Sequence, residues 1–301
     1  MKRIKVFALV LILYCALSCF TYMKMFDSNT FQLYRLSRQI YQHDFPIQGN
    51  TTWRKQPTEM NCHPKKIDMS KEKRPVTALL SFPGSGNTWT RHLIEYTSGI
   101  ATGSVYCDPT LKPVFIGECQ VRDVIVIKSH ERENDWVKFE KAIVLIRSPY
   151  RSIISFFNYN NARNRHKGIA PKAVFDRNFG DFSMTYIHDW LTYNLKWLQF
   201  KGPTFVLIYE ELLQNTVIEL KKLNDFLNVT VSDNTYSCLL KNIEGGYRRS
   251  YKSLNGTFNP MQYYTGHINK TVENAITKVE KMIAHVTGNN HNIERFTSVF
   301  K

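Results

Sequence analysis

The sequence predicts an α/β fold in which helices flank a central parallel sheet, with a single transmembrane anchor at the N-terminus. Short, continuously apolar runs alternate with longer segments of helical period, which is typical of βαβ units. A turn containing two glycines follows the first of these runs, at the kind of position where open α/β sheets bind anions. The 301 residues leave room for one such domain of roughly 200 to 250 residues and for extensions.

The strands and helices of this domain follow one another from about residue 75. Buried strands are expected at Val76–Phe82, Asp123–Ile127, Ala142–Ile146 and Phe205–Tyr209. Helices are expected at Thr90–Thr97, Tyr186–Phe200 and Glu210–Leu227. A further helix is expected to begin with Ser148 as its cap and Pro149 in its first turn. This alternation predicts a doubly wound sheet.

The N-terminus predicts a membrane anchor. Residues 6–23 are uncharged and largely apolar, and about 18 residues is near the lower limit for a transmembrane helix. The basic residues before them predict a cytoplasmic tail at 1–5 and a single-pass type II protein. A cleaved signal peptide is the alternative, but Tyr22–Met25 lacks the small residues of a cleavage site. The short span favours a Golgi membrane, with 24–74 as a luminal stem and 75–301 as a luminal domain.

Glycosylation patterns and cysteines agree with a secretory location. Acceptor patterns for N-glycosylation occur at Asn50, Asn228, Asn255 and Asn269. The cysteines beyond the anchor are Cys62, Cys107, Cys119 and Cys238, an even number that permits two disulfides. Of the three possible pairings we favour the local bond between Cys107 and Cys119, which leaves Cys62 for Cys238. No cysteine spacing indicates a zinc site.

The net charge of +15 predicts an anionic ligand or partner. Nucleic acid is the ordinary partner of so basic a chain. However, the basic residues are scattered among strands and helices, and the membrane anchor argues against a nuclear protein. We therefore expect an anionic small molecule and no nucleic acid.

The segment Thr77–Arg91 predicts the first anion site. Its apolar strand ends at Pro83, and Gly84 and Gly86 precede a helix. Glycines let the backbone approach a phosphate, and the N–H groups at a helix N-terminus favour negative charge. Asn87 stands where the common nucleotide-binding loop has lysine, which disfavours an ATPase or a nucleoside triphosphate kinase.

Two further strand ends carry candidate site residues. Lys128 and His130 follow the strand at Asp123–Ile127, where His130 is suited to take a proton from a hydroxyl. An ordinary hydrogen-bonded loop histidine is the alternative. Arg147 ends the next strand, and Ser152 and Ser155 share one face of the following helix, which predicts a second anion site. The alternative there is a capped helix with a solvated serine face.

Four segments together resemble one known family. They read S-F-P-G-S-G-N-T-W, K-S-H, R-S-P-Y-R-S-I-I-S-F-F and F-V-L-I-Y-E-E-L-L. Their order is similar to that in sulfotransferases that use 3′-phosphoadenosine 5′-phosphosulfate (PAPS). The likeness is greatest to the sulfotransferase part of the WSC-domain-containing (WSCD) sulfotransferases and covers roughly Pro75–Thr287, including T-G-S-V-Y-C-D and Gly117-Glu118. The stem is too short and too poor in cysteine for a WSC module.

The resemblance implies a sulfotransferase fold, a sulfotransferase domain at 75–301, PAPS as co-substrate and no metal. It also implies roles for the matching residues. The 5′-phosphosulfate would be held by Ser85, Gly86, Asn87 and Thr88. The adenine would stack on Trp89 and lie near Tyr209, and the 3′-phosphate would meet Arg147, Ser155 and Arg249, for which Arg248 is nearly as good a match. His130 would be the general base and Lys128, with Arg91 as the second choice, would stabilise the leaving group, because Gly84 stands where many relatives have lysine.

Two rival functions remain at this point. A luminal glycosyltransferase shares the anchor and stem but usually needs an acidic metal-binding D-x-D pair, which the sequence lacks. A catalytically inactive nucleotide- or polyanion-binding protein is compatible with Gly84 and with the positive charge. The acceptor is expected to be a hydroxyl on a glycan or another secretory-pathway molecule. Candidate residues for contacting an anionic glycan are Tyr159, Arg163, Arg165, His166, Trp190 and Trp197. The alternative is that the tryptophans belong to the core and that the other residues lie in a solvated loop.

Overall fold

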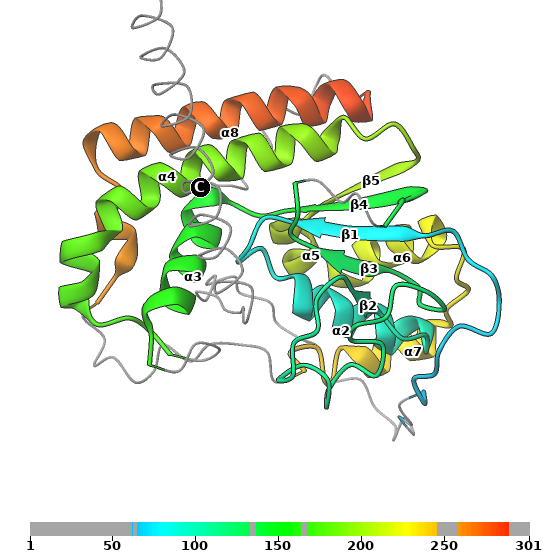
Figure 1. Ribbon diagram of the computed structural model, residues 1–301. Helices are drawn as coiled ribbons and strands as arrows, with labels where there is room; N and C mark the ends of the chain where they lie inside the picture. Colours follow the sequence, from blue (N-terminus) through cyan, green and yellow to red (C-terminus); the bar gives the residue numbers. More distant parts are fainter. Residues whose placement is uncertain (1–61, 63–64, 133–136, 164–167, 246–257, 289–301) are drawn as a thin grey trace, which may run out of the picture. The chain divides into compact units, whose positions relative to one another are not determined.

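Five parallel strands form the sheet at the centre of the domain. The computed structural model describes residues 62, 65–132, 137–163, 168–245 and 258–288. Within them the strands are β1 (Thr77–Ser81), β2 (Gly103–Ser104), β3 (Ile127–Ser129), β4 (Lys141–Ile146) and β5 (Thr204–Ile208). They lie in the order β2-β3-β1-β4-β5, which places β1 in the middle (Figure 1). Every strand pair is parallel, as the apolar runs predicted.

Helices cover both faces of the sheet (Figure 1). On one face lie α2 (Asn87–Ser98), α5 (Tyr209–Gln214), α6 (Thr216–Phe226) and α7 (Asp233–Leu239). On the other lie α3 (Pro149–Asn161), α4 (Lys172–Leu198) and α8 (Gly266–Thr287), and the short 3-10 helix η2 (Pro260–Tyr263) precedes α8. The α/β fold with a parallel sheet flanked by helices is therefore confirmed.

The core on the α2 face joins strands and helices through aliphatic side chains. Leu79 of β1 and Ile143 of β4 belong to the same buried cluster as Leu93 of α2 and Leu220 of α6. Residues Leu79, Leu93 and Leu220 are fully shielded from solvent, so α2 is held firmly behind the turn that begins it. Packing on this face thus fixes the position of the helix that follows the predicted anion-binding turn.

The predicted elements differ from the observed ones mainly at their ends. The strand expected at Asp123–Ile127 was misplaced, because residues 122–125 bend, Asp123 has φ +56°, and β3 begins at Ile127. The helix expected at Tyr186–Phe200 begins earlier, at Lys172. The helix expected at Glu210–Leu227 is two helices, α5 and α6, which separate at Asn215.

The structure contains both of the disulfides that were favoured from sequence. Cys107 bonds to Cys119, and Cys62 bonds to Cys238 of α7. The second bond ties the end of the predicted stem to the domain. The predicted anchor at 6–23 lies outside the described residues, and no helix among the residues that are described is long and apolar enough to cross a bilayer.

Candidate active site

The predicted site segments meet at one edge of the sheet. Because the strands are parallel, the carboxyl ends of β3, β1, β4 and β5 lie next to one another. The register pairs Leu80 of β1 with Ser129 of β3, and Ser81 with Leu145 of β4. The turn after β1, the His130 segment after β3 and Arg147 after β4 therefore leave the sheet side by side.

The turn after β1 depends on two glycines in the left-handed region. Gly84 has φ +83° and Gly86, which caps α2, has φ +89°. A Cβ atom at Gly84 would collide with the carbonyl oxygen of Ser152, and one at Gly86 with the ring of Tyr209. The backbone can follow this path only without side chains at both positions. A lysine at position 84 would not fit, so any cation at this turn comes from elsewhere in the chain.

The two predicted anion sites are in contact through Arg147. This side chain is 1% exposed, and its Nη1 donates to the carbonyl oxygen of Gly84 at 2.7 Å. Its guanidinium carbon lies 4.6 Å from the ring centroid of Tyr209. Ser155 Cβ lies 3.3 Å from the position that a Cβ of Gly84 would take. Arg147, Ser155 and the turn therefore form one basic region.

Buried hydroxyls in this region are suited to an anionic ligand. Within the described part of the chain, Ser85 Oγ and Ser152 Oγ are buried and have no hydrogen-bond partner. Ser152 and Ser155 are 0% and 1% exposed, so the alternative of a solvated serine face on α3 was wrong. A buried hydroxyl without a partner is costly, and such groups are expected where a ligand completes the hydrogen bonding.

Asn87 braces the turn from within. Its Nδ2 donates to the carbonyl oxygen of Leu79 and to Ser81 Oγ, both at 3.1 Å. The side-chain donors of Asn87 are therefore used by the protein, and its backbone N–H, in the first turn of α2, is the group that can face a ligand. Thr88 is also buried in that first turn.

Aromatic side chains line the β5 side of the turn. Tyr209 begins α5, rather than ending the strand, and its ring lies beside Gly86. Trp89 packs edge-on against Tyr209 with the ring centroids 5.5 Å apart, and its Nε1 donates to the carbonyl oxygen of Ile243. Trp89 and Tyr209 are thus adjacent, and both belong to the buried cluster on the α2 face. Their contact with a nucleoside stays a prediction.

His130 has the geometry of a base with a defined tautomer. Its Nδ1 lies 2.7 Å from the carbonyl oxygen of Ser81, and a carbonyl oxygen can only accept a hydrogen bond. Nδ1 therefore carries the proton, and Nε2 is the basic nitrogen of the neutral ring. The alternative explanation, a loop histidine that forms an ordinary hydrogen bond, is right about the bond. However, this bond occupies Nδ1 and leaves Nε2 as the nitrogen that can act as a base.

Lys128 lies deeper than His130, in a buried charged cluster. It is 5% exposed, and burial lowers the pKa of Lys128 to about 8, with Arg91 acting in the same direction and Glu118 and Asp108 against it. Its Nζ lies 5.7 Å from the ring centroid of Tyr106. The lysine ammonium thus loses its proton more readily than an exposed lysine would, and it lies close to the His130 segment.

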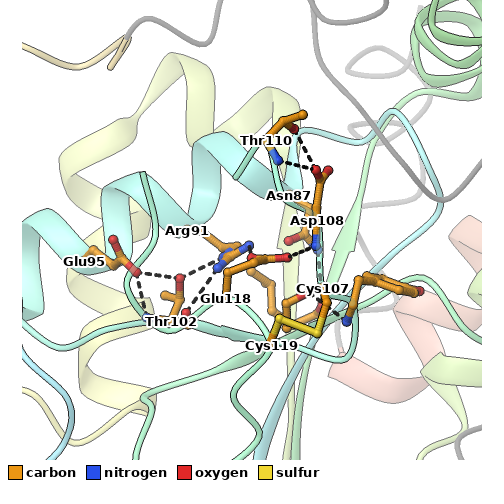
Figure 2. Close-up of polar contacts among 12 residues, drawn as sticks. Asn87, Arg91, Glu95, Thr102, Cys107, Asp108, Thr110, Glu118 and Cys119 are labelled. Carbon is orange, nitrogen blue, oxygen red and sulfur yellow. Dashed lines mark hydrogen bonds and ion pairs between the residues drawn. A yellow bond between two sulfur atoms is a disulfide. The ribbon is translucent and has the colours of Figure 1, made fainter. Parts of the chain in front are cut away.

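Arg91 is part of the same cluster and is not available to a ligand (Figure 2). Its Nη1 pairs with Glu118 Oε2 at 2.7 Å, and its Nε and Nη2 donate to the hydroxyl and carbonyl oxygens of Thr102. Both side chains of the ion pair are 0% exposed. The prediction of Arg91 as a second choice for stabilising the leaving group was therefore wrong, since its donors hold α2 to the segment around the Cys107–Cys119 bond.

Glu210 is a buried carboxyl beside the basic region that sequence reasoning missed. Its Oε1 accepts from the backbone N–H of Ser148 at 3.1 Å. Burial raises the pKa of Glu210 to about 7, and Arg147 acts in the opposite direction. The acidic pair after the strand Phe205–Tyr209 was visible in the sequence, but nothing in its spacing placed one member against the cap of α3.

Other predicted residues lie away from this region or outside the described part. Arg249, Arg248, Arg165 and His166 lie outside the described residues, and Arg163 is exposed. Tyr159 and Trp190 are fully buried and Trp197 is 8% exposed, so none of the three forms a surface for a glycan. The core alternative is confirmed for the two tryptophans, whereas neither prediction for Tyr159 was right. The indole N–H groups bond to main-chain oxygens, Trp190 to Arg147 and Trp197 to Glu131.

Comparison with known proteins identifies the family. Residues 74–278 match the family model of the sulfotransferase domain. The chain belongs to the sulfotransferase family. A WSCD family member of Aedes aegypti is 37% identical over 189 residues, which cover 60% of this chain and 59% of the relative. A WSCD family member of Drosophila melanogaster is 36% identical over 208 residues, which cover 66% of this chain and 63% of the relative.

The match with these relatives covers only part of each protein. The chain spans about three fifths of the length of the curated relatives that it matches. Among solved structures, mouse sulfotransferase SULT7A1 complexed with PAP aligns over 76% of this chain and 89% of that chain, with 15% identity and a TM-score of 0.48. The resemblance to WSCD sulfotransferases that the sequence motifs indicated is confirmed.

Proposed function

We propose that this protein is a membrane-anchored luminal sulfotransferase that moves a sulfuryl group from PAPS to a hydroxyl of a glycan or another secretory-pathway acceptor. The observation that carries the proposal is the convergence of the glycine turn, Arg147 and His130 at one edge of the sheet in a chain of the sulfotransferase family. A donor with a 5′-phosphosulfate and a 3′-phosphate needs two neighbouring anion sites, and this edge offers both.

The nucleotide fits the residues that are present. Backbone N–H groups of Gly86, Asn87 and Thr88, at the N-terminus of α2, face where a 5′-phosphate would lie, and the buried hydroxyl of Ser85 adds a donor. Arg147 and Ser155 would take the 3′-phosphate, with Arg249 as a further contact. Trp89 and Tyr209 would hold the adenosine between the two phosphates.

The transfer itself requires positioning and charge stabilisation. His130 Nε2 accepts the proton of the acceptor hydroxyl while the hydroxyl oxygen forms a bond to sulfur. The bond from sulfur to the bridging phosphate oxygen breaks, and the N–H groups of the turn and Lys128 stabilise the charge that grows on that oxygen. The product nucleotide is 3′-phosphoadenosine 5′-phosphate (PAP). The step needs no metal, which stays a prediction.

The proposed location of the protein rests on its sequence. The apolar segment at 6–23 and the glycosylation patterns beyond it support a single-pass type II Golgi protein with the transferase domain in the lumen. The high positive charge supports an anionic glycan or glycoconjugate as acceptor.

The test compares transfer with binding in the purified full chain. PAPS carrying radiolabelled sulfate is offered with glycans, tyrosine-containing peptides and small alcohols, and PAP affinity is measured by calorimetry. His130→Ala should lower turnover by about 10²- to 10⁴-fold and leave PAP affinity within about twofold, because a general base acts only in the transfer step. The matched control is His188→Ala, at an exposed position of α4, which should change neither quantity.

Two structural observations are compatible with a second function. No lysine can stand at Gly84, and Lys128 is a buried cation with a lowered pKa, so a nucleotide- or polyanion-binding protein of the same fold without activity is the alternative. Wild-type protein that binds PAP but transfers no sulfuryl group to any acceptor would favour that alternative. An unchanged turnover in His130→Ala would exclude the mechanism above.

A further inference from the structure

Tyr106 contacts the candidate base from two directions, although it belongs to a different part of the chain. It follows β2 and is 7% exposed. Its ring is stacked on the ring of His130, with the centroids 5.8 Å apart and the planes inclined by 19°. Its hydroxyl accepts a hydrogen bond from the backbone N–H of His130 at 2.8 Å. One side chain thus contacts both the backbone and the imidazole of His130.

The same hydroxyl also fixes the residue after the base. It donates to Glu131 Oε1 at 3.0 Å, while the backbone N–H of Glu131 donates to Ser129 Oγ and its carbonyl oxygen accepts from Trp197. Tyr106 therefore lies in a chain of hydrogen bonds that leaves the segment after β3 little freedom. On the edge of the imidazole, Nδ1 bonds to the carbonyl oxygen of Ser81.

These contacts constrain the tautomer and the orientation of the imidazole, the two properties on which a general base depends. The bond from Nδ1 to Ser81 determines which nitrogen carries the proton, and the stacked ring of Tyr106 limits rotation of the imidazole out of that bond. Nε2 is then held in one direction. Lys128 Nζ lies 5.7 Å from the same tyrosine ring, so the base and the nearby cation share one aromatic support.

Tyr106 is itself held by residues on both sides of it in the chain. Its backbone N–H donates to Ser104 Oγ, and the next residue, Cys107, is bonded to Cys119. Glu118, beside Cys119, pairs with Arg91 of α2 (Figure 2). The loop that carries Tyr106 is therefore anchored to α2, the helix that follows the predicted anion-binding turn.

We propose that Tyr106 is a positioning residue that holds the imidazole of His130 in the Nδ1–H tautomer with Nε2 directed at the acceptor hydroxyl. This inference rests on the proposed function only for the identity of the hydroxyl. The orientation and tautomer of His130 are properties of the protein without substrate, and they can be measured whether or not an acceptor is known.

The experiment uses two substitutions with separate effects, in the full chain. Tyr106→Phe keeps the stacked ring and loses the hydrogen bonds to His130 and Glu131. Tyr106→Leu loses the ring as well. Tyr236, another buried tyrosine with a hydrogen-bonded hydroxyl, provides the matched controls Tyr236→Phe and Tyr236→Leu.

Two readouts are taken for each variant. The first is the ¹⁵N spectrum of the imidazoles, with the His130 signals identified by their loss in His130→Ala. The wild type should show protonated Nδ1 and unprotonated Nε2, and Tyr106→Leu should show averaged signals of both tautomers. The second is transfer kinetics, where Tyr106→Leu should lower kcat about 10- to 100-fold and Tyr106→Phe about 3- to 10-fold, with PAP affinity within about twofold. A merely structural role would lower kcat and PAP affinity together.

The outcomes separate this inference from the proposed function. Wild-type His130 signals in a folded Tyr106→Leu variant would overturn the positioning role, as would equal losses in the Tyr236 controls. Averaged signals without any transfer activity in the wild type would support the positioning role and contradict the proposed reaction. Failure of the wild type to bind PAP would contradict the proposed function. The ¹⁵N spectrum of His130 in Tyr106→Leu would still decide whether Tyr106 positions the imidazole.

Discussion

Arg91 of α2 and Arg147, which follows β4, are both buried, and they differ in what surrounds them. Arg91 is paired with Glu118 inside a cluster that also contains Asp108 and Thr102. Arg147 instead donates to the carbonyl oxygen of Gly84 and lies over the ring of Tyr209. The carboxyl on its side, Glu210, has a pKa raised to about 7 and is therefore only partly ionised near neutral pH.

This difference separates a charge that is paired within the fold from a charge that lies at the predicted anion site. The positive charge of Arg91 is neutralised by Glu118, so this arginine adds little attraction for an anion. Arg147 contacts the glycine turn, where Ser85 and Ser152 have buried hydroxyls, so an anion bound at this turn would lie beside a positive charge. Exposure does not distinguish the two side chains, because both are almost completely buried.

The largest expected effect tests the Arg91 side of this comparison. Arg91→Met should lower the free energy of unfolding by about 3 to 5 kcal/mol, because Glu118 would remain as a buried charge without its partner. The measurement is denaturant unfolding of the full chain, followed by fluorescence. Arg91→Met combined with Glu118→Leu should recover much of the loss.

The control for this prediction is an exposed ion pair. Lys172 pairs with Asp176 one turn later in α4, and both side chains are largely solvated. Lys172→Met should leave stability almost unchanged, because water and salt screen an exposed pair. A loss in Arg91→Met as small as that of the control would mean that the buried pair does not hold α2 in place.

The next effect concerns Lys128 and has the opposite sign. Burial lowers the pKa of Lys128 to about 8 from 10.5, so the folded state binds fewer protons than the unfolded state between these values. Stability therefore rises with pH through that window, and at pH 7 the buried charge costs up to about 3 kcal/mol. Lys128→Met should be more stable than the wild type at pH 7, and the difference should shrink toward pH 10. A difference that does not depend on pH would contradict this explanation.

The smallest effect concerns a single hydroxyl on the Arg147 side. Ser152→Ala removes a buried Oγ that has no partner within the described residues, and alanine is the better helix former. Stability should be unchanged or up to about 1 kcal/mol higher, while PAP affinity falls about fivefold. Ser183→Ala in α4, which removes a hydroxyl bonded to Gly180, is the matched control and should leave PAP affinity unchanged. An unchanged affinity in Ser152→Ala would show that this hydroxyl does not serve the ligand.

Features that depend on neighbouring residues in the chain were predictable from the sequence. The parallel sheet, the glycine turn and the start of α3 at Ser148-Pro149 each follow from local pattern, and all are present, although the Ser148 side chain makes no capping hydrogen bond. The strand Ala142–Ile146 was placed to within one residue because its whole length is buried. The helix Tyr186–Phe200 was drawn too short because the aromatic residues before it, Phe175 and Phe179, were not counted in its period.

Features that depend on contacts between distant segments were not predictable. Arg91 and Lys128 were both candidate cations at strand or helix ends, and only the pairing with Glu118, from the disulfide loop, distinguishes them. Tyr106 was visible in T-G-S-V-Y-C-D, but no pattern places it on a histidine that is 24 residues away. Trp190 and Trp197 were ambiguous between core and surface, since aromatic residues serve in both, and the structure buries them. Tyr159 was expected at the surface and is buried as well.

The central claim is tested most directly by calorimetric binding of PAP to the full chain, comparing the wild type with Arg147→Ala. The matched control is the Arg91→Lys variant, measured on folded protein, because Arg91 is also a buried arginine but lies outside the predicted anion site. The account predicts saturable binding by the wild type, a loss of about 30-fold or more in Arg147→Ala, equivalent to about 2 kcal/mol, and little change in Arg91→Lys. Equal affinity of the wild type and Arg147→Ala, or no binding by folded wild-type protein, would contradict it.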